Sequence, residues 1–335
     1  MLRHLTKIRQ FRGQKFYGID HHESAGLIVG DYMGNSIRIA RGSFSRPAKI
    51  TVIDTLDLNG IDLPVTFPHS VHWLDDESFL VTLAKQHRHS PKLQGSVLLV
   101  GLDGWKARRI DDVFRSHTFE SFPVFAGPCG EFIGVSYAGL DAVLLFDESG
   151  KLYKAVGPRP SIDSHIRREL MLDSGSLVEL SLKAPHAVVA LNGTLFIADT
   201  GHGNIIRVDG VRASYLHDLG DDKFAWRPDV PSPPPFGQPT SLRITGELLI
   251  VCDFASGAIV ELLNWMADRG TILGHRLFFS PNSRGPLVRL FGHKTPKRVH
   301  AFDFCRLADG WLLNDAHGRA LWFLAAPVNA GRGDL

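Results

Sequence analysis

Three histidines stand at the start of apolar segments that have the character of β-strands. His69 follows Phe-Pro, His186 follows Ala-Pro, and His300 follows Arg-Val, at intervals of 117 and 114 residues. Imidazole nitrogens ligate transition metals, and three of them around one open position form a catalytic metal centre. The residue types and spacing therefore predict a three-histidine metal site, if the fold brings these distant segments together.

An internal repeat predicts the fold that could do so. In its clearest copy, residues 185–210 (PHAVVALNGTLFIADTGHGNIIRVDG), an Asn-Gly turn joins two apolar runs, the second run ends in Asp199, and a Gly-rich loop leads to a third. Asn-Gly between apolar runs is a strong hairpin signal. Related copies begin at Gly18, Phe67, Ser121, Gln238 and Val299. Six units of three strands and a variable fourth predict an all-β fold, a single six-bladed β-propeller over residues 1–335.

The fourth strand of each unit is less regular than the first three. Candidates are the segments 48–56, 212–219 and 286–292. The last copy ends near Leu324 without one, and we expect the N-terminal segment LTKIRQF to supply it and close the ring.

In a propeller, the start of every first strand and the loop after every second strand lie on one face, near the central channel. Because His69, His186 and His300 belong to alternate copies, we expect them at the corners of a near-equilateral triangle. One divalent ion would bind there; zinc suits three neutral imidazoles best, and iron, copper or manganese also fit. The alternative is that these histidines cap strands by bonding loop backbone.

Further candidates occupy the loops of that face. His202 and His317 lie in equivalent corner loops and could move protons near pH 7. Tyr32, in the first corner loop, and Trp226 and Arg227, in a long connection from 218 to 238, are expected to contact the substrate. The aspartates that recur at the end of the second strands, Asp199 among them, are interpreted as structural, closing the loops that follow.

The repeat resembles NHL-type propellers, with Pro at the head of the first strand and Ala-Asp before a Gly/Asn loop. Pro-His heads on alternate blades resemble the peptidyl-α-hydroxyglycine α-amidating lyases. That resemblance implies a catalytic zinc held by His69, His186 and His300, a catalytic tyrosine near Tyr137, and cleavage of a carbinolamide C–N bond to an amide and glyoxylate. The family's first-blade arginine is not matched, since Asp31 and Tyr32 stand at that corner.

The leading functional prediction is a metal-dependent lyase that acts on a small-molecule or peptide-like substrate. A metal-dependent hydrolase of the lactonase kind is a second reading, although the Glu-Gly-Pro opening of that family is absent here. A non-catalytic binding propeller is the third.

Composition limits the partners and the compartment. Lys and Arg number 37 against 35 Asp and Glu, so a formal charge of +2 favours neither nucleic acid nor an anionic membrane as partner. No signal peptide and no apolar stretch of about 18 residues is recognisable. Three widely spaced cysteines (Cys129, Cys252, Cys305) predict reduced, buried thiols and a cytoplasmic location.

Overall fold

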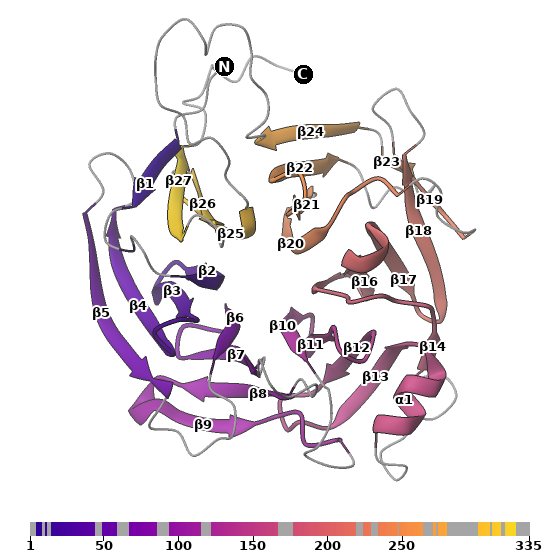
Figure 1. The fold of residues 1–335 in the computed structure, drawn as a ribbon, viewed down its shortest axis with the longest axis horizontal. Helices are drawn as coiled ribbons and strands as arrows, with labels where there is room; N and C mark the ends of the chain where they lie inside the picture. Colours follow the sequence, from indigo (N-terminus) through magenta and orange to yellow (C-terminus); the bar gives the residue numbers. More distant parts are fainter. Residues whose placement is uncertain are drawn as a thin grey trace, which may run out of the picture.

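A computed structural model describes most of the chain. The described residues are 5–8, 11, 15–43, 49–58, 67–85, 94–114, 122–166, 177–218, 224–228, 234–246, 248–263, 271–272, 274–279, 301–308, 310–315 and 319–325. Within these residues the strands form six separate sheets arranged in a ring about a central axis (Figure 1). The prediction of a six-bladed β-propeller is confirmed.

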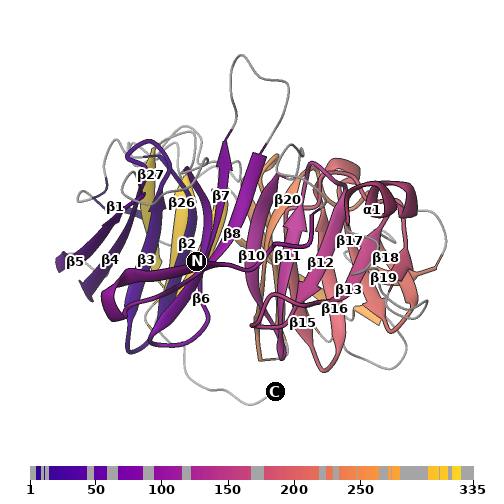
Figure 2. The same cartoon turned by 90° about the horizontal axis from the view of Figure 1, so that it is seen from below.

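The first three blades follow one another along the chain, and seen from the side their strands run across the thickness of the disc (Figure 2). Blade 1 contains β2 (Phe16–His22), β3 (Gly26–Asp31), β4 (Ser36–Ser43) and β5 (Lys49–Asp57). Blade 2 contains β6 (Pro68–Trp73), β7 (Ser78–Lys85), β8 (Gln94–Gly101) and β9 (Lys106–Arg109). Blade 3 contains β10 (Pro123–Cys129), β11 (Phe132–Tyr137), β12 (Ala142–Phe146), β13 (Leu152–Gly157) and the parallel β14 (Leu177–Glu179).

A short helix, α1 (Arg159–His165), lies at the periphery between β13 and β14 (Figure 1). Blade 4 contains β15 (Ala187–Leu191), β16 (Thr194–Asp199), β17 (Asn204–Asp209), β18 (Arg212–Asp218), β19 (Phe224–Arg227) and β23 (Thr271–Ile272). Blade 5 contains β20 (Pro239–Thr245), β21 (Leu248–Asp253), β22 (Ala258–Leu263) and β24 (Gly274–Phe279).

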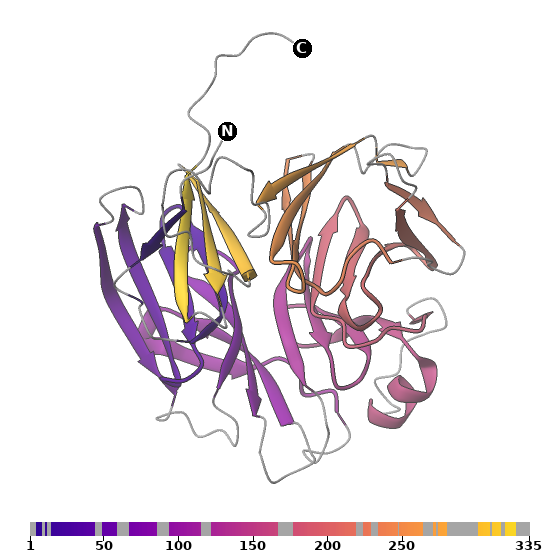
Figure 3. The same cartoon turned by 45° about the horizontal axis from the view of Figure 1, so that its top comes forward.

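Blade 6 closes the ring with strands from both ends of the chain. Its sheet order is β1 (Leu5–Ile8), β27 (Ala320–Ala325), β26 (Gly310–Asp315) and β25 (Ala301–Leu307). Leu5 to Ile8 pair antiparallel with Leu324 to Leu321, and the last strands of the chain lie beside the first blade (Figure 3). The prediction that the N-terminal segment supplies the last strand is confirmed.

The other fourth strands were predicted with mixed success. β5 and β18 occupy the segments expected in blades 1 and 4. In blade 5, β24 pairs with β22, although the segment 286–292 was expected in this position. Residues 286–292 lie outside the described residues.

The apolar core lies between neighbouring blades. Ile28 and Ile37 of blade 1 pack with Val71 and Phe79 of blade 2, for example, and comparable clusters join the other blades. At the innermost strands the backbones approach closely, since a Cβ on Gly18 would lie 2.5 Å from the backbone nitrogen of Val71. Only glycine fits there, so β2 and β6 hold their channel ends in a fixed relation.

A bulge shapes the channel end of most first strands. The register shifts between Pro68 and Ser70 in blade 2, and equivalent shifts occur at the start of β2, β10, β20 and β25. A bulge leaves one residue unpaired and re-aims its side chain. The first strands therefore present a ring of side chains to the axis.

Two expectations about the chain as a whole can be checked. Cys129, Cys252 and Cys305 are buried and free, as predicted, and burial raises their thiol pKa values. Among the described residues, no helix has the length and apolar character needed to cross a membrane.

Candidate functional site

Each blade contributes one residue to a ring at the channel. The contributors are the residues at the bulge, or immediately before β15 in blade 4, and we call this place in each blade the ring position. The ring positions are Tyr17, His69, Val124, His186, Thr240 and Phe302. All six line one small cavity, whose volume of about 10 Å³ has room for roughly one water molecule.

Two of the three predicted metal ligands meet at this cavity. The ring centroids of His69 and His186 are 6.4 Å apart, with the ring planes tilted by 58°. His69 donates from Nδ1 to the Val124 carbonyl at 2.9 Å, and His186 donates from Nδ1 to the Ala184 carbonyl at 2.9 Å. A proton on Nδ1 leaves a lone pair on each Nε2, the arrangement found when histidines ligate metals.

Both imidazoles are neutral at physiological pH. Burial, and then the nearby His186, lower the pKa of His69 to about 3. Burial also lowers the pKa of His186. Neutral rings with fixed tautomers suit metal binding and general-base chemistry alike.

The third corner of the expected triangle is occupied by another residue type. Phe302 takes the ring position of blade 6, and its ring centroid lies 5.7 Å from that of His69 and 6.1 Å from that of His186. His300 lies two residues earlier, outside the described residues. Among the described residues, no three His, Cys, Asp or Glu side chains lie close enough together to hold a metal.

The spacing to the aspartate at the end of the second strand identifies Phe302 in the sequence. It precedes Asp315 by 13 residues, the interval that also separates His186 from Asp199 and Thr240 from Asp253, whereas His300 precedes Asp315 by 15. When the repeats are aligned on this aspartate, Phe302 matches His186 and Thr240. When the sixth repeat is aligned on His300 instead, Phe302 does not match them.

Aromatic side chains form the wall above the histidines. Tyr17 stacks on His69, with centroids 4.9 Å apart and planes within 6° of parallel. Tyr32, predicted to contact substrate, packs edge-on against Tyr17 at 5.0 Å and over Phe67 at 5.2 Å. The Lys15 ammonium group lies 4.7 Å from the Tyr17 ring centre. Tyr32 thus borders the channel mouth through Tyr17.

Tyr137, predicted as a catalytic residue, is placed in the core. Its side chain is fully buried, its hydroxyl donates to Asp111 Oδ2 at 3.4 Å, and Phe114 packs on its ring. Burial raises the pKa of Tyr137 well above its usual value. It does not belong to the residues that line the cavity, because it points from the end of β11 into the apolar cluster of blade 3.

Of the two histidines predicted in corner loops, the structure describes His202. His202 is about 39% exposed, and its Nδ1 lies 2.8 Å from Asp199 Oδ2. Its loop lies beside the head of β15, since Gly201 N–H donates to the Lys183 carbonyl. His317 lies outside the described residues.

In blades 1 and 5 the corner aspartates close the loops that follow them, as predicted; in blade 5, Asp253 Oδ2 accepts the Ser256 N–H at 3.3 Å. Two corner aspartates also bind backbone that lies ahead of the first strand of their blade. Asp199 Oδ1 accepts the Lys183 N–H at 2.7 Å, and Asp253 Oδ1 accepts the Gln238 N–H at 2.6 Å. Asp31 accepts the Gly34 N–H at 2.9 Å.

Trp226 and Arg227 do not lie over the channel face, and the expectation of a substrate-binding loop there needs correction. The segment from Phe224 to Arg227 is β19, the fifth strand of blade 4, which adds to the outer side of β18. Trp226 is buried against Phe196, and Arg227 is exposed. Apolar alternation in this segment extends the sheet outward, away from the axis.

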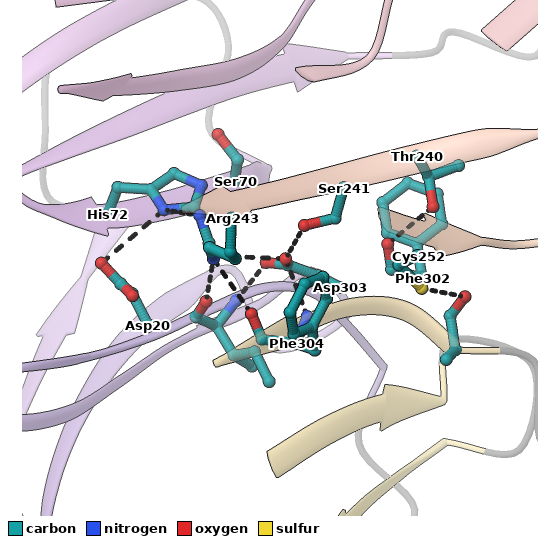
Figure 4. A network of polar contacts seen from close by, with 12 residues as sticks. Asp20, Ser70, His72, Thr240, Ser241, Arg243, Cys252, Phe302, Asp303 and Phe304 are labelled. Carbon is teal, nitrogen blue, oxygen red and sulfur yellow. Dashed lines mark hydrogen bonds and ion pairs between the residues drawn. The ribbon is translucent and has the colours of Figure 1, made fainter. Parts of the chain in front are cut away.

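Sequence reasoning missed a buried polar network along the channel. Arg243, from β20, donates to the Phe304 carbonyl, the Ile19 carbonyl, Asp303 Oδ1 and His72 Nδ1, at 3.0 to 3.2 Å (Figure 4). Asp20 accepts the Trp73 N–H at 3.0 Å. We call Asp20, His72, Arg243 and Asp303 the floor network; its members come from blades 1, 2, 5 and 6.

His72 lies three residues after His69, and in a regular strand two such side chains point to opposite sides. Both nevertheless line the cavity. The bulge between Pro68 and Ser70 breaks the alternation of the strand, so side chains three apart reach the same space.

Comparisons with known proteins support the fold. No family model and no curated protein sequence matches the chain. A putative gluconolactonase structure aligns over 96% of this chain and 92% of its own, with a TM-score of 0.54 and 12% identity. A streptogramin B lyase aligns over 96% and 97%, with a TM-score of 0.52 and 10% identity.

A third solved structure, a PQQ-bound aldose sugar dehydrogenase from Streptomyces coelicolor, aligns over 97% of this chain and 98% of its own. Its TM-score is 0.51 and its identity 8%. At such identities the likeness establishes the propeller and leaves the reaction to be argued from the site.

Proposed function

We propose that this propeller is a metal-dependent enzyme whose centre is the channel mouth, most simply a lyase for a small or peptide-like substrate. The observation that carries the proposal is the pair of neutral imidazoles, His69 and His186. Each is anchored through Nδ1 to a backbone carbonyl and so keeps a lone pair on Nε2, and both rings line the same cavity.

His69 and His186 would supply two nitrogen ligands, with His300 the predicted third. Zinc remains the first choice, with iron, copper or manganese as alternatives. Such an ion would polarise a substrate oxygen or lower the pKa of a water molecule. The chain's own contribution is to hold both rings neutral and correctly turned, which the two carbonyl bonds and the burial of His69 accomplish.

The Asp199–His202 pair is the proposed proton-transfer group. Its carboxylate holds His202 Nδ1, so Nε2 is left to exchange protons at the exposed face. The aromatic wall of Tyr17, Tyr32 and Phe302 would exclude water from one side of the substrate.

Phe302 favours a second candidate, a propeller that binds a ligand without catalysing a reaction. An apolar ring in place of a third imidazole leaves the described ring with two nitrogen ligands. In that case His69 and His186 would act as hydrogen-bond acceptors for the bound molecule.

Zinc stoichiometry tests the proposal. After dialysis against zinc, we expect about one equivalent in the wild type and near-complete loss in His69→Ala and His186→Ala, since each variant removes one nitrogen ligand. His22→Ala is the matched control, because His22 lies at the opposite end of β2 and bonds Ser24. Metal content would be read by plasma mass spectrometry.

A positive result would be followed by assays for glyoxylate release from a peptidyl-α-hydroxyglycine and for lactone hydrolysis. Absence of metal from the wild type after exposure to zinc, iron, copper and manganese would overturn the metal-dependent enzyme and leave the binding propeller.

A further inference from the structure

One ring nitrogen of His72 is buried and has no partner among the described residues. His72 is 1% exposed, and none of the residues that the structure describes forms a hydrogen bond with its Nε2. A buried polar atom left unpaired is costly, so such atoms usually meet a water molecule or a ligand. The ring lines the central cavity, and its other nitrogen is engaged by the floor network (Figure 4). Its Nε2 is therefore the polar atom that His72 has left to offer to a ligand in the cavity.

Arg243 fixes which nitrogen of His72 carries the proton. His72 Nδ1 lies 3.0 Å from Arg243 Nη1 and 3.7 Å from Asp20 Oδ2. A guanidinium group can only donate. The shorter contact thus makes Nδ1 an acceptor, and the neutral ring must carry its proton on Nε2. A nitrogen in that state cannot ligate a metal, but it can donate to an oxygen.

The charges of the floor network favour a neutral oxygen over an anion as the partner of His72 Nε2–H. Around His72 the floor network holds one guanidinium, Arg243, and two carboxylates, Asp20 and Asp303. Burial raises the pKa of Asp20, but the Arg243 guanidinium and the Trp73 amide act against this, and the pKa of Asp20 lies below its usual value. A further anion would therefore add to an excess of negative charge.

The lining of the cavity also offers acceptors. His69 and His186 line it, with lone pairs on Nε2. A hydroxyl group or a water molecule accepts one hydrogen bond and donates others, which matches a donor at His72 and acceptors at His69 and His186. The cavity has the size of roughly one water molecule, so it suits one such group and not a whole substrate.

We propose that this cavity is a hydroxyl-binding site, in which His72 Nε2–H donates to the oxygen of a water molecule or of a substrate hydroxyl and Arg243 is the positioning residue. The inference rests on the proposed site of His69 and His186 and not on its metal. It narrows the substrate class to molecules that bring a neutral hydroxyl group to the centre of the channel.

Long-range ¹H–¹⁵N correlation spectra of histidine-labelled protein test the donor. We expect His72 to be protonated on Nε2, and His69 and His186 on Nδ1. His72→Gln should remove only the His72 signal and so assign it. In Arg243→Met, the acceptor at Nδ1 loses its donor, so the proton should move toward Nδ1 and Asp20, a change that loss of packing alone does not cause.

Small probes test the ligand class without a known substrate. Methanol supplies a neutral hydroxyl and formate an anion of similar size. We expect methanol to shift the His72 Nε2–H signal and show a contact from its methyl group, and formate to leave the signal in place. A wild-type His72 without a proton on Nε2, or a response to formate alone, would overturn the proposal, even if Arg243→Met fails to fold.

Adding zinc to the same sample separates this inference from the proposed function. Shifts at His69 and His186 with His72 unchanged would support both. No response at His69 and His186 would count against the metal alone, whereas loss of the His72 Nε2 proton on zinc binding would make His72 a ligand and end its assignment as a donor.

Discussion

His69 and His72 stand three residues apart on the same strand, yet the structure gives them opposite hydrogen-bonding roles. His69 donates from Nδ1 to a backbone carbonyl and keeps a lone pair on Nε2. His72 accepts at Nδ1 from a guanidinium and keeps a proton on Nε2. The difference comes from the partner, since a carbonyl can only accept and a guanidinium can only donate.

The comparison extends to the two layers of the channel. The ring positions combine aromatic and imidazole groups, with neutral histidines at the mouth. The floor network is ionic and joins blades 1, 2, 5 and 6 through Arg243. The ring positions thus carry side chains suited to binding, Arg243 joins the blades, and His72 takes part in both layers.

The largest expected effect is the loss of stability when Arg243 is removed from the floor network. Arg243→Ala removes the ion-pair partner of the buried Asp303 carboxylate, so the free energy of unfolding should fall by about 3–5 kcal/mol. Arg159→Ala removes an exposed pair with Glu179 and should cost at most about 1 kcal/mol. Chemical denaturation of both variants measures the difference. Equal losses would show that the network does not hold the blades together.

Acid should destabilise the protein through His69, one of the residues at the ring positions. The folded pKa of His69 is about 3, below the 6.5 of an unfolded chain, so the unfolded state binds more protons between these values. The stability contributed by neutral His69 is present above pH 6.5 and is lost as pH falls toward 3. Between pH 7 and pH 5 this amounts to about 2 kcal/mol.

His69→Gln keeps an amide donor for the Val124 carbonyl and cannot titrate in this range. Urea unfolding at pH 7 and pH 5 should therefore show a smaller loss in the variant than in the wild type. A variant as acid-sensitive as the wild type would place the titration at another group.

Phe302→His tests how the residue type at the ring position of blade 6 affects zinc affinity. It adds an imidazole at the ring position of blade 6, beside those of His69 and His186, so zinc affinity should rise by at least about 10-fold. Competition with a chromophoric chelator measures the change. An unchanged affinity would mean that the third ligand already comes from elsewhere, as His300 would supply it.

Much of the fold was accessible from the sequence because each repeat has local signals. Asn192-Gly193 marked a hairpin, and Asp31 and Asp253, at the ends of second strands, marked corners that their carboxylates do close. Ring closure by the N-terminal strand followed from a missing strand in the last repeat. The segment around Trp226 was misread because a Pro-rich connection and an outer strand look alike when the neighbouring strand is unknown.

The site was accessible only in part. His69 and His186 were found from their strand heads, and both reach the cavity. Phe302 was missed because the sixth repeat was aligned on His300 instead of on Asp315. Arg243 gave no local signal, since it reads as one basic residue in a β-strand of blade 5 and meets His72 across 171 residues of sequence.

The sequence by itself determined the number of blades, the order of the first three strands within each blade and the face on which the strand heads gather, because hairpins and corners form between residues close in the chain. The tertiary structure decided which side chains share the channel. Bulges re-aim residues such as His69 and Phe302, and closure of the ring brings Arg243 against Ile19, His72 and Asp303. Those contacts depend on the relative placement of blades, which no local pattern encodes.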